Sequence, residues 1–430
     1  MSGMKTQQAN FKVAGVASEY ALRRAALKRF NGRGSRWLNA CLGYRYIAIL
    51  GCLFSITVAH AQARQPQLFL TFDYHMRPAQ AAAAPARYVF VWGDSASMTS
   101  AFAKYSAGSL LSAYFPYARD PDAKHDLAFW KARHPTWVTY RCDGVTPAYF
   151  PGDANVPLDI SNPAVLAWQV DQFTHLRPGL HAVALDNFQF QNKLGVCGVH
   201  DASGQFVRKY SGKLDDPAFA AAGVRWLERI SAALHERHVK VVINHIPDLS
   251  AEGDDPMSPL VAGMVSAVDG MLDEHAQDAL HDPSKAALLA KLVQSVQSKG
   301  KWMYLLYQYQ GASERLTESA MANYLTMAGP KTAIYIPEEG TISGLEPRFY
   351  GFDQPIGEPC GSAIMKDGVQ FRAFSHGLAI YAPTDSAAGS VVVPSGYQTV
   401  DGHSAGAQLH LAGGQGRVLY APSSNACARH

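Results

Sequence analysis

Short apolar runs alternate with amphipathic segments along residues 88–337. Most of the runs are apolar without a polar break, as strands buried on both faces of a sheet are. Alternation at this spacing predicts a parallel α/β sheet, and eight units predict a closed (β/α)8 TIM barrel. The eight predicted strands are Tyr88–Gly93, Leu110–Tyr114, Trp137–Arg141, Ala182–Asp186, Lys240–His245, Ala267–Glu274, Trp302–Tyr307 and Thr332–Pro337.

The segments between these runs carry helix start signals. Asn162-Pro163, Asp216-Pro217 and Asp282-Pro283 each pair an N-cap residue with proline at the first helical position. The links after the first two runs have weaker signals, so an open doubly wound sheet is the alternative. No G-x-G-x-x-G loop follows the first run, which counts against a dinucleotide-binding form of that alternative.

The texture of the chain changes after residue 345. Short strand-like runs follow one another there, separated by Gly, Pro, Ser and Asp, as in small antiparallel sheets. We therefore expect a barrel over residues 88–345 and a small, sandwich-like antiparallel β-domain over 346–430. The predicted strands are Gln370–Phe374, Leu378–Ala382, Ser390–Val393, Ala407–Leu411 and Arg417–Tyr420.

An apolar run of residues 46–59 follows basic residues and precedes two A-x-A sites ending at Ala61 and Ala63. It is shorter than the roughly 20 residues that span a bilayer, so residues 1–63 read as a secretory presequence. We expect a secreted or periplasmic protein without membrane contact after cleavage; the alternative is an uncleaved N-terminal anchor. Residues 64–87, with the Ala/Pro segment Ala79–Ala86, are predicted to be a linker.

Charge is unevenly distributed along the chain. Residues 1–63 contain nine Lys and Arg and one acidic residue, so the net charge of +3 leaves about −5 for the remainder. A mildly acidic body argues against a nucleic acid as partner. The sequence does not indicate an oligomeric state.

Four cysteines lie outside the presequence, and four cysteines allow three pairings. Cys142 and Cys197 follow neighbouring predicted strands, whereas Cys360 and Cys427 bracket the C-terminal region. In an exported chain disulfides are favoured over free thiols. We therefore predict the pairs Cys142–Cys197 and Cys360–Cys427.

Polar residues follow the predicted strands at the end of a barrel where active sites lie. Asp186 ends an apolar strand, where a carboxylate is unfavourable without a role or a partner. Glu274 ends the strand two places further round the ring. Asp273 competes with Glu274, because a shift of one residue reverses which side chain points inward. Asp186 and Glu274 are the predicted catalytic pair, since glycosidic cleavage needs two carboxyl groups with separate tasks.

Aromatic and polar residues at the same strand ends suit a sugar site, because rings stack on sugar faces and polar groups bind hydroxyls. For Asp143 a turn role is as good an interpretation as substrate binding. For Asp159 a loop or capping role is likewise as good an interpretation as substrate binding. The predicted substrate-binding residues are Trp92, Asp94, Tyr140, Asp143, Asn187, Phe188, Asn244, Asp273, Tyr307 and Gln308.

Other hydrolase classes lack their sequence signals. No G-x-S-x-G elbow follows a strand, which disfavours a Ser-His-Asp hydrolase. No H-E-x-x-H or comparable cluster is present, which disfavours a metal hydrolase. We expect neither a metal nor a cofactor.

Several of these segments together resemble glycosyl-hydrolase-like family 15 of barrel proteins and, more distantly, the endo-α-1,4-polygalactosaminidase barrels. The resemblance covers residues 88–424 and implies a (β/α)8 barrel, a C-terminal β-domain and glycosidase activity. It also implies that Asp186 is the nucleophile and Glu274 the acid/base, and it does not extend to the substrate. The segments are Trp137–Asp143 (WVTYRCD), Leu158–Pro163 (LDISNP), Ala184–Phe188 (ALDNF), Val268–Glu274 (VDGMLDE) and Phe371–Thr384 (FRAFSHGLAIYAPT).

The leading hypothesis is a secreted, retaining glycoside hydrolase that acts on a polysaccharide or oligosaccharide. A non-catalytic glycan-binding or matrix protein on the same scaffold is the alternative. A polysaccharide lyase with a Tyr or His base is the third interpretation.

Overall fold

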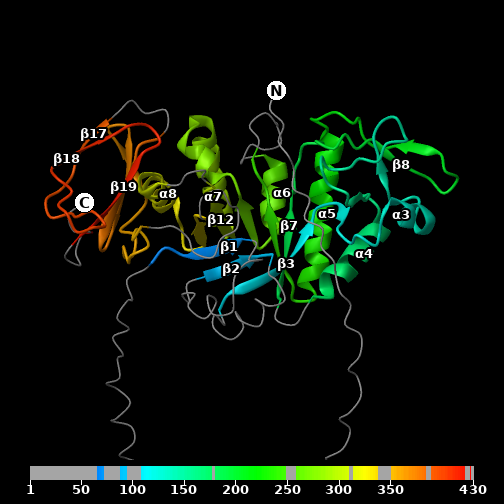
Figure 1. The fold of residues 1–430 in the computed structure, drawn as a ribbon, viewed down its shortest axis with the longest axis horizontal. Helices are drawn as coiled ribbons and strands as arrows, with labels where there is room; N and C mark the ends of the chain where they lie inside the picture. Colours follow the sequence, from blue (N-terminus) through cyan, green and yellow to red (C-terminus); the bar gives the residue numbers. More distant parts are fainter. Residues whose placement is uncertain are drawn as a thin grey trace, which may run out of the picture. The chain divides into compact units, whose positions relative to one another are not determined.

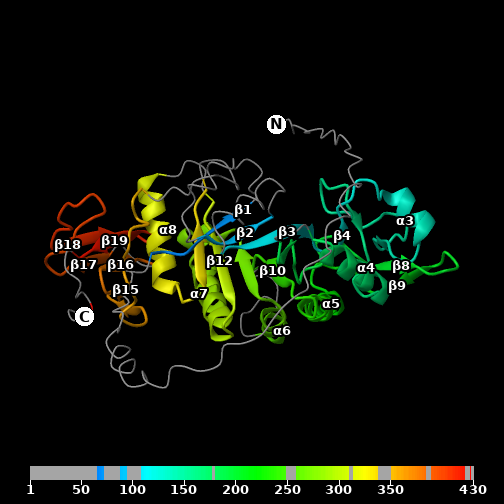
Figure 2. The same cartoon turned by 90° about the horizontal axis from the view of Figure 1, so that it is seen from below.

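The computed structural model describes residues 65–71, 88–93, 108–176, 180–247, 258–308, 313–337, 350–383, 389–421 and 427. Within them, eight parallel strands close a barrel, which confirms the predicted fold class (Figures 1 and 2). In order around the barrel they are β1 (Leu68–Thr71), β13 (Thr332–Tyr335), β12 (Trp302–Leu306), β11 (Gly270–Asp273), β10 (Lys240–Asn244), β7 (Ala182–Asp186), β3 (Leu110–Pro116) and β2 (Tyr88–Trp92).

Helices and one 3₁₀ turn connect the later strands. The residue before each α-helix caps it: Asn162, Asp216, Ser258, Asp282 and Ser313 each accept a hydrogen bond from a backbone N–H of the first turn. The helix starts predicted at Asn162, Asp216 and Asp282 are therefore confirmed. The elements are α4 (Pro163–Thr174), α5 (Pro217–His235), α6 (Pro259–Ala267), η2 (Ala276–Leu280), α7 (Pro283–Ser298) and α8 (Glu314–Met327).

Aromatic rings fill the barrel interior. The Phe90 ring of β2 stacks on Tyr304 of β12 with centroids 4.6 Å apart, and Phe69 of β1 lies 5.3 Å from Tyr304. Because β1 and β13 separate β2 from β12 in the sheet, the Phe90–Tyr304 contact crosses the interior. The interior below the strand ends is therefore a packed core rather than a channel, as in other barrels of eight strands.

Two of the strand expectations were wrong. The predicted third strand, Trp137–Arg141, contributes only the short β5 (Thr139–Tyr140) to a three-stranded antiparallel sheet with β8 (Gly198–His200) and β9 (Phe206–Arg208). Its apolar residues pack in a local core around Trp130. The missing barrel strand is β1, which lies in the segment predicted to be a linker and pairs with both β2 and β13.

The three-stranded sheet belongs to a region that we call the excursion, at the right of Figure 1. It consists of residues 117–161, which follow β3, and residues 187–215, which follow β7. The Cys142–Cys197 disulfide joins its two parts, as predicted, with Cα atoms 5.0 Å apart. Its other elements are α3 (Leu127–Arg133), β4 (Arg119–Asp120) and β6 (Val156–Pro157).

The C-terminal residues form antiparallel sheets, as predicted. A four-stranded sheet has the order β14-β15-β16-β19, and a two-stranded sheet pairs β17 with β18. The predicted Cys360–Cys427 disulfide is present. The strands are β14 (Ile364–Lys366), β15 (Val369–Phe374), β16 (Gly377–Tyr381), β17 (Gly389–Val392), β18 (Gln408–Leu411) and β19 (Gly416–Tyr420).

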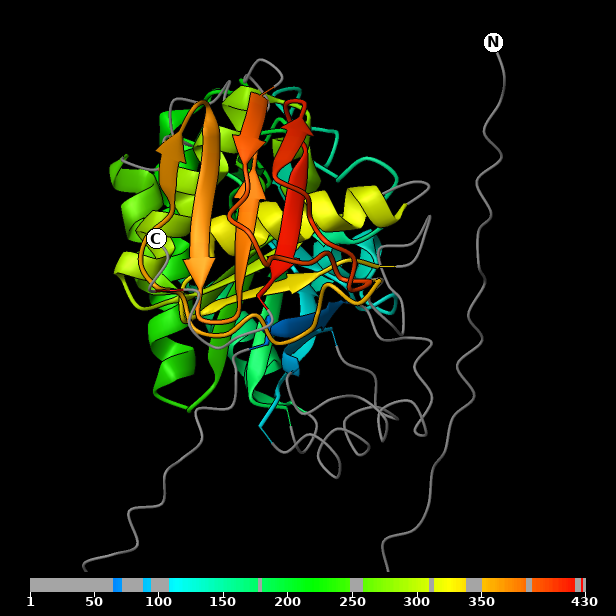
Figure 3. The same ribbon diagram turned by 90° about the vertical axis from the view of Figure 1, so that its left-hand side faces the viewer.

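The four-stranded sheet packs on α8, which Figure 3 shows behind it. The buried Glu318 of α8 accepts a hydrogen bond from the Val418 backbone N–H at 3.0 Å and pairs with Arg417.

Across the part of the chain that the structure describes, no helix has the length and apolar character needed to cross a bilayer.

The assignment of β1 to the barrel can be tested at Phe69, whose side chain is fully buried. Phe69→Ala should lower the free energy of unfolding by about 3–5 kcal/mol, because it leaves a cavity in the core. Val145→Ala, at a side chain that is 75% exposed, is the control and should change it by less than about 0.5 kcal/mol. Urea denaturation measures both. A Phe69 variant as stable as the control would mean that β1 is not part of the barrel.

Candidate active site

Asp186 ends β7 and accepts hydrogen bonds from three side chains. The donors are Tyr114 Oη (2.7 Å) and Asn187 Nδ2 (2.7 Å), both to Oδ2, and Asn244 Nδ2 (2.8 Å) to Oδ1. The Asp186 side chain is 8% exposed. An ionised carboxylate can only accept hydrogen bonds, so this set of donors suits a buried carboxylate in a fixed orientation.

Strand register explains why these groups meet. Tyr114 lies opposite Ala184, so it points to the same face as Asp186, two residues further along β7. Ala182 and Ala184 are small, which leaves space above them for polar side chains. Asn187 turns sharply with φ +60°, a conformation that asparagine tolerates better than most residues, and its amide folds back onto Asp186.

Glu274 lies one residue beyond β11 and faces the same interior. Asn244 of β10 is in register with Leu272, so Leu272 and Glu274 share the face of Asn244. Burial raises the pKa of the Glu274 carboxyl, and the negative charge of Asp186 raises it further. A hydrogen bond from Asn244 acts in the opposite direction.

Asn244 therefore lies between the two carboxyl groups. Its Nδ2 donates to Asp186 Oδ1 at 2.8 Å, and a hydrogen bond from the same side chain lowers the pKa of Glu274. Its Oδ1 is buried and has no partner among the described residues. A buried amide oxygen without a partner costs free energy of folding.

Asp273, the competitor of Glu274, faces the other way. It lines a recess between the barrel and α7 together with Ile246, Lys285 and Leu288. Burial raises the pKa of its carboxyl to about 6, although the backbone N–H of His275 donates to it at 2.9 Å. Asp273 is thus a buried acid of the helix layer, and it does not join Asp186.

Two further predicted substrate-binding residues support the structure around the site. Gln308 Nε2 donates to the Glu274 carbonyl oxygen at 2.7 Å, so Gln308 holds the backbone that carries the acid. Tyr307 points away from the interior, where its hydroxyl donates to Asn323 of α8 at 2.7 Å.

Tyr140 and Asp143 lie in the excursion rather than beside Asp186. The Tyr140 ring is buried and stacks on His200 at 4.5 Å. Asp143 is a turn residue: it accepts hydrogen bonds from the Thr146 hydroxyl, the Thr146 N–H and the Val145 N–H, which lower its pKa to about 2.

Phe188 and Trp92 are core residues at the strand ends. Phe188 is buried and packs edge-on against Tyr117. Trp92 is fully buried, and its indole N–H has no partner among the described residues. Asp94 lies outside the described residues.

Tyr114 is the site residue that sequence reasoning missed. It lies within the run Leu110–Tyr114 rather than after it, so a search of strand ends passes over it. The available signal was alternation: Ser112 and Tyr114 are polar residues two apart in an otherwise apolar strand, which places both on one face.

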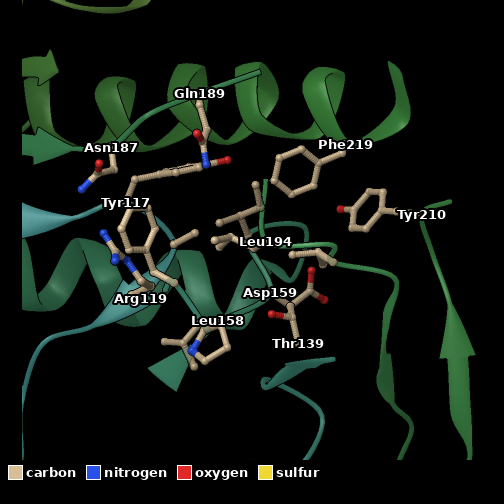
Figure 4. Close-up of a pocket in the computed structure, with 15 residues that line it drawn as sticks. Tyr117, Arg119, Thr139, Leu158, Asp159, Asn187, Gln189, Leu194, Tyr210 and Phe219 are labelled. Carbon is tan, nitrogen blue, oxygen red and sulfur yellow. The ribbon is translucent and has the colours of Figure 1, made fainter. Parts of the chain in front are cut away.

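Asn187 also borders a recess at the foot of the excursion, drawn in Figure 4. Tyr117, Leu158, Leu194 and Phe219 form much of its apolar wall. Buried Asp159 lines the recess and pairs with Lys209 Nζ at 2.6 Å. Of the two interpretations of Asp159, this ion pair favours the loop role.

Among the described residues, no group of three His, Cys, Asp or Glu side chains is arranged to hold a metal ion. The side chains that donate to Asp186 are all neutral groups.

No family model matches the chain, and no curated protein sequence matches it. Solved structures with a similar fold include an α-amylase from Lactobacillus plantarum (TM-score 0.49, 10% identity, 84% of this chain and 99% of that chain). A glycoside hydrolase family 30 subfamily 8 xylanase, Xyn30A from Clostridium acetobutylicum, gives 0.41 at 12% identity (84% and 97%). Ega3 of Aspergillus fumigatus, in complex with galactosamine, gives 0.37 at 13% identity (66% and 93%). At these scores the likeness carries no functional argument, and the barrel assignment rests on the strand order.

The raised pKa of Asp273 predicts a pH-dependent gain in stability for Asp273→Asn. A carboxyl whose pKa is higher in the folded state favours folding while protonated, and this stability is lost as pH rises from about 4 to about 6. Asparagine does not ionise and can still accept from the His275 N–H. At pH 7 the variant should therefore be more stable, by up to about 3 kcal/mol.

Denaturation of the wild type and the Asp273→Asn variant at pH 3.5 and pH 7, both approximate choices below and above the titration, measures this difference. A gain of the same size at both pH values would show that Asp273 does not titrate as its burial implies.

Proposed function

We propose that this protein is a retaining glycoside hydrolase with Asp186 as nucleophile and Glu274 as acid/base. The observation that carries the proposal is the convergence of these two carboxyl groups at the mouth of the barrel, with the Asn244 amide between them. Two carboxyl groups in unlike environments, one protonated and one ionised, are what glycosidic cleavage requires.

Glu274 has the environment of the acid. Its raised pKa keeps the proton on the carboxyl at higher pH than an ordinary glutamate would, so it can protonate the departing glycosidic oxygen. As the Asp186 charge is consumed in bond formation, one cause of the raised pKa disappears. The pKa of Glu274 then falls, so its proton is transferred more readily to the leaving group.

Asp186 has the environment of the nucleophile. Three neutral donors hold its oxygens in place, so little reorientation is needed for attack on the anomeric carbon. A covalent glycosyl ester forms as the bond to the leaving oxygen breaks. Glu274 then accepts a proton from water, which attacks the same carbon and releases Asp186 as a carboxylate.

The same pair of carboxyl groups supports a ligand class. Because two carboxyl groups with separate tasks are what glycosidic cleavage requires, we assign the substrate to the polysaccharides and oligosaccharides. The two disulfides support an exported protein, because such bonds persist in oxidising compartments.

The first activity test uses three variants on a panel of plant and bacterial glycans. Asp186→Asn and Glu274→Gln should each lower the release of reducing ends by at least about 10³-fold, since each removes a group that acts in the transition state. Asp273→Asn is the matched control: it removes the adjacent buried carboxyl and should keep activity within about threefold, because this side chain faces the helix layer.

Proton NMR of the first-formed product reports the anomeric configuration, and retention is the expected result. Inversion would remove Asp186 from the role of nucleophile, and full activity in both the Asp186 and Glu274 variants would refute the site.

The second test concerns the bridging amide. Asn244→Leu keeps the branched shape of the side chain but removes the hydrogen bond that lowers the pKa of Glu274. The basic limb of the kcat/KM profile reports the free acid, so it should move to higher pH while the maximum falls. Initial rates across the pH range measure this, and a limb that stays in place would mean that Asn244 does not contact the acid.

A further inference from the structure

The C-terminal sheet reaches the turn that follows Glu274. The Tyr381 hydroxyl of β16 is buried and donates to the Ala279 carbonyl of η2 at 3.1 Å. At the turn before β19, Gly414 approaches the same element so closely that a Cβ would lie 2.0 Å from the Leu280 carbonyl oxygen. Gly414 also has φ +77°, so both its backbone and its contact require glycine.

The turn η2 is in turn connected to Glu274. Only His275 separates them, and its N–H is held by Asp273. Gln277 of η2 accepts from the Gln308 backbone N–H at 3.1 Å, while the Gln308 amide donates to the Glu274 carbonyl at 2.7 Å. A shift of η2 would therefore move the backbone on which the acid stands.

The sheet itself packs on α8, which lies behind it in Figure 3. Ser319 accepts from the Gly416 N–H at 3.1 Å, and Glu318 accepts from the Val418 N–H at 3.0 Å. Buried hydrogen bonds of this kind are costly to break, since each partner would be left unsatisfied.

We propose that the C-terminal sheet positions the acid of the barrel, and that Tyr381 is a positioning residue that acts on Glu274 through η2. The inference rests on the proposed function for its catalytic meaning. It assigns to the C-terminal domain a part in the active site that its distance along the chain does not suggest.

Displacement of η2 should change the pKa of Glu274 in a defined direction. The groups that shift its pKa among the described residues are Asp186 of β7, Asn244 of β10, and Asp273 and His275 on its own segment. Burial is the largest cause of its raised pKa. If η2 loosens and water reaches the carboxyl, the pKa falls toward that of an ordinary glutamate.

Tyr381→Phe tests the proposal, because it removes the hydroxyl and keeps the ring. The Glu274 titration can be followed without substrate, as the infrared carboxyl difference between each protein and its Glu274→Gln counterpart. The pKa should be lower in the Tyr381→Phe protein, the basic limb of the activity profile should move to lower pH, and kcat should fall by about tenfold with little change in KM.

Tyr420→Phe is the matched control in the same sheet, since the Tyr420 hydroxyl has no partner among the described residues. It should leave the titration and kcat unchanged. An unchanged Glu274 titration in the Tyr381→Phe protein would overturn the inference, even if its Tm drops. If that titration shifts but the wild type cleaves no glycan, the proposed function fails and the positioning role stands.

Discussion

The burial of carboxyl groups at the mouth of the barrel is the constraint on which the rest of this structure depends. A carboxylate there loses its water, so each one needs donors or must keep its proton. Asp186 receives three donors, whereas Glu274 shares one amide and lies beside the charge of Asp186. The two acids thus differ because their surroundings differ, and this difference is what makes them useful as a pair.

The neighbouring strands are built to satisfy that constraint. Tyr114 on β3, Asn187 after β7 and Asn244 on β10 come from three adjacent strands of the barrel wall, and each donates a hydrogen bond to Asp186. Around the mouth the amide of Gln308 fixes the Glu274 backbone. The polar residues of the strand ends therefore serve mainly to orient the two acids.

The C-terminal domain takes part in the same arrangement. Its sheet is tied to α8 through Glu318 and reaches η2 through Tyr381. A barrel loop is easily displaced when it is supported only at its ends, whereas η2 packs on α7 and contacts the C-terminal sheet through Tyr381 and Gly414. Geometry held within about half an ångström is what catalytic groups need, and a second domain is one way to supply it.

The amino-acid sequence by itself determined the barrel class, the capped helix starts, the antiparallel C-terminal strands and the two disulfide pairs. The helix starts and strands follow from local periodicity and from N-cap and proline signals, which act over a few residues. The disulfide pairs, 55 and 67 residues apart, follow from where the cysteines lie relative to the predicted strands. It also placed Asp186 and Glu274 at strand ends, because continuous apolar runs stop where the barrel meets water. β1 was missed because a four-residue strand beside an Ala/Pro segment has too little pattern, and Trp137–Arg141 was misassigned because an apolar run does not reveal which core buries it.

Only the tertiary structure decided which strand-end residues meet. Register between β10 and β11 turns Glu274 inward and Asp273 outward, and no local signal distinguishes two adjacent acids. Tyr140 and Asp143 do not belong to the site, because their run lies in the excursion. Tyr114 does belong to it, because β3 lies beside β7. The physical reason is that side chains act on one another through space, and the distances are set by strand pairing between segments far apart in the chain.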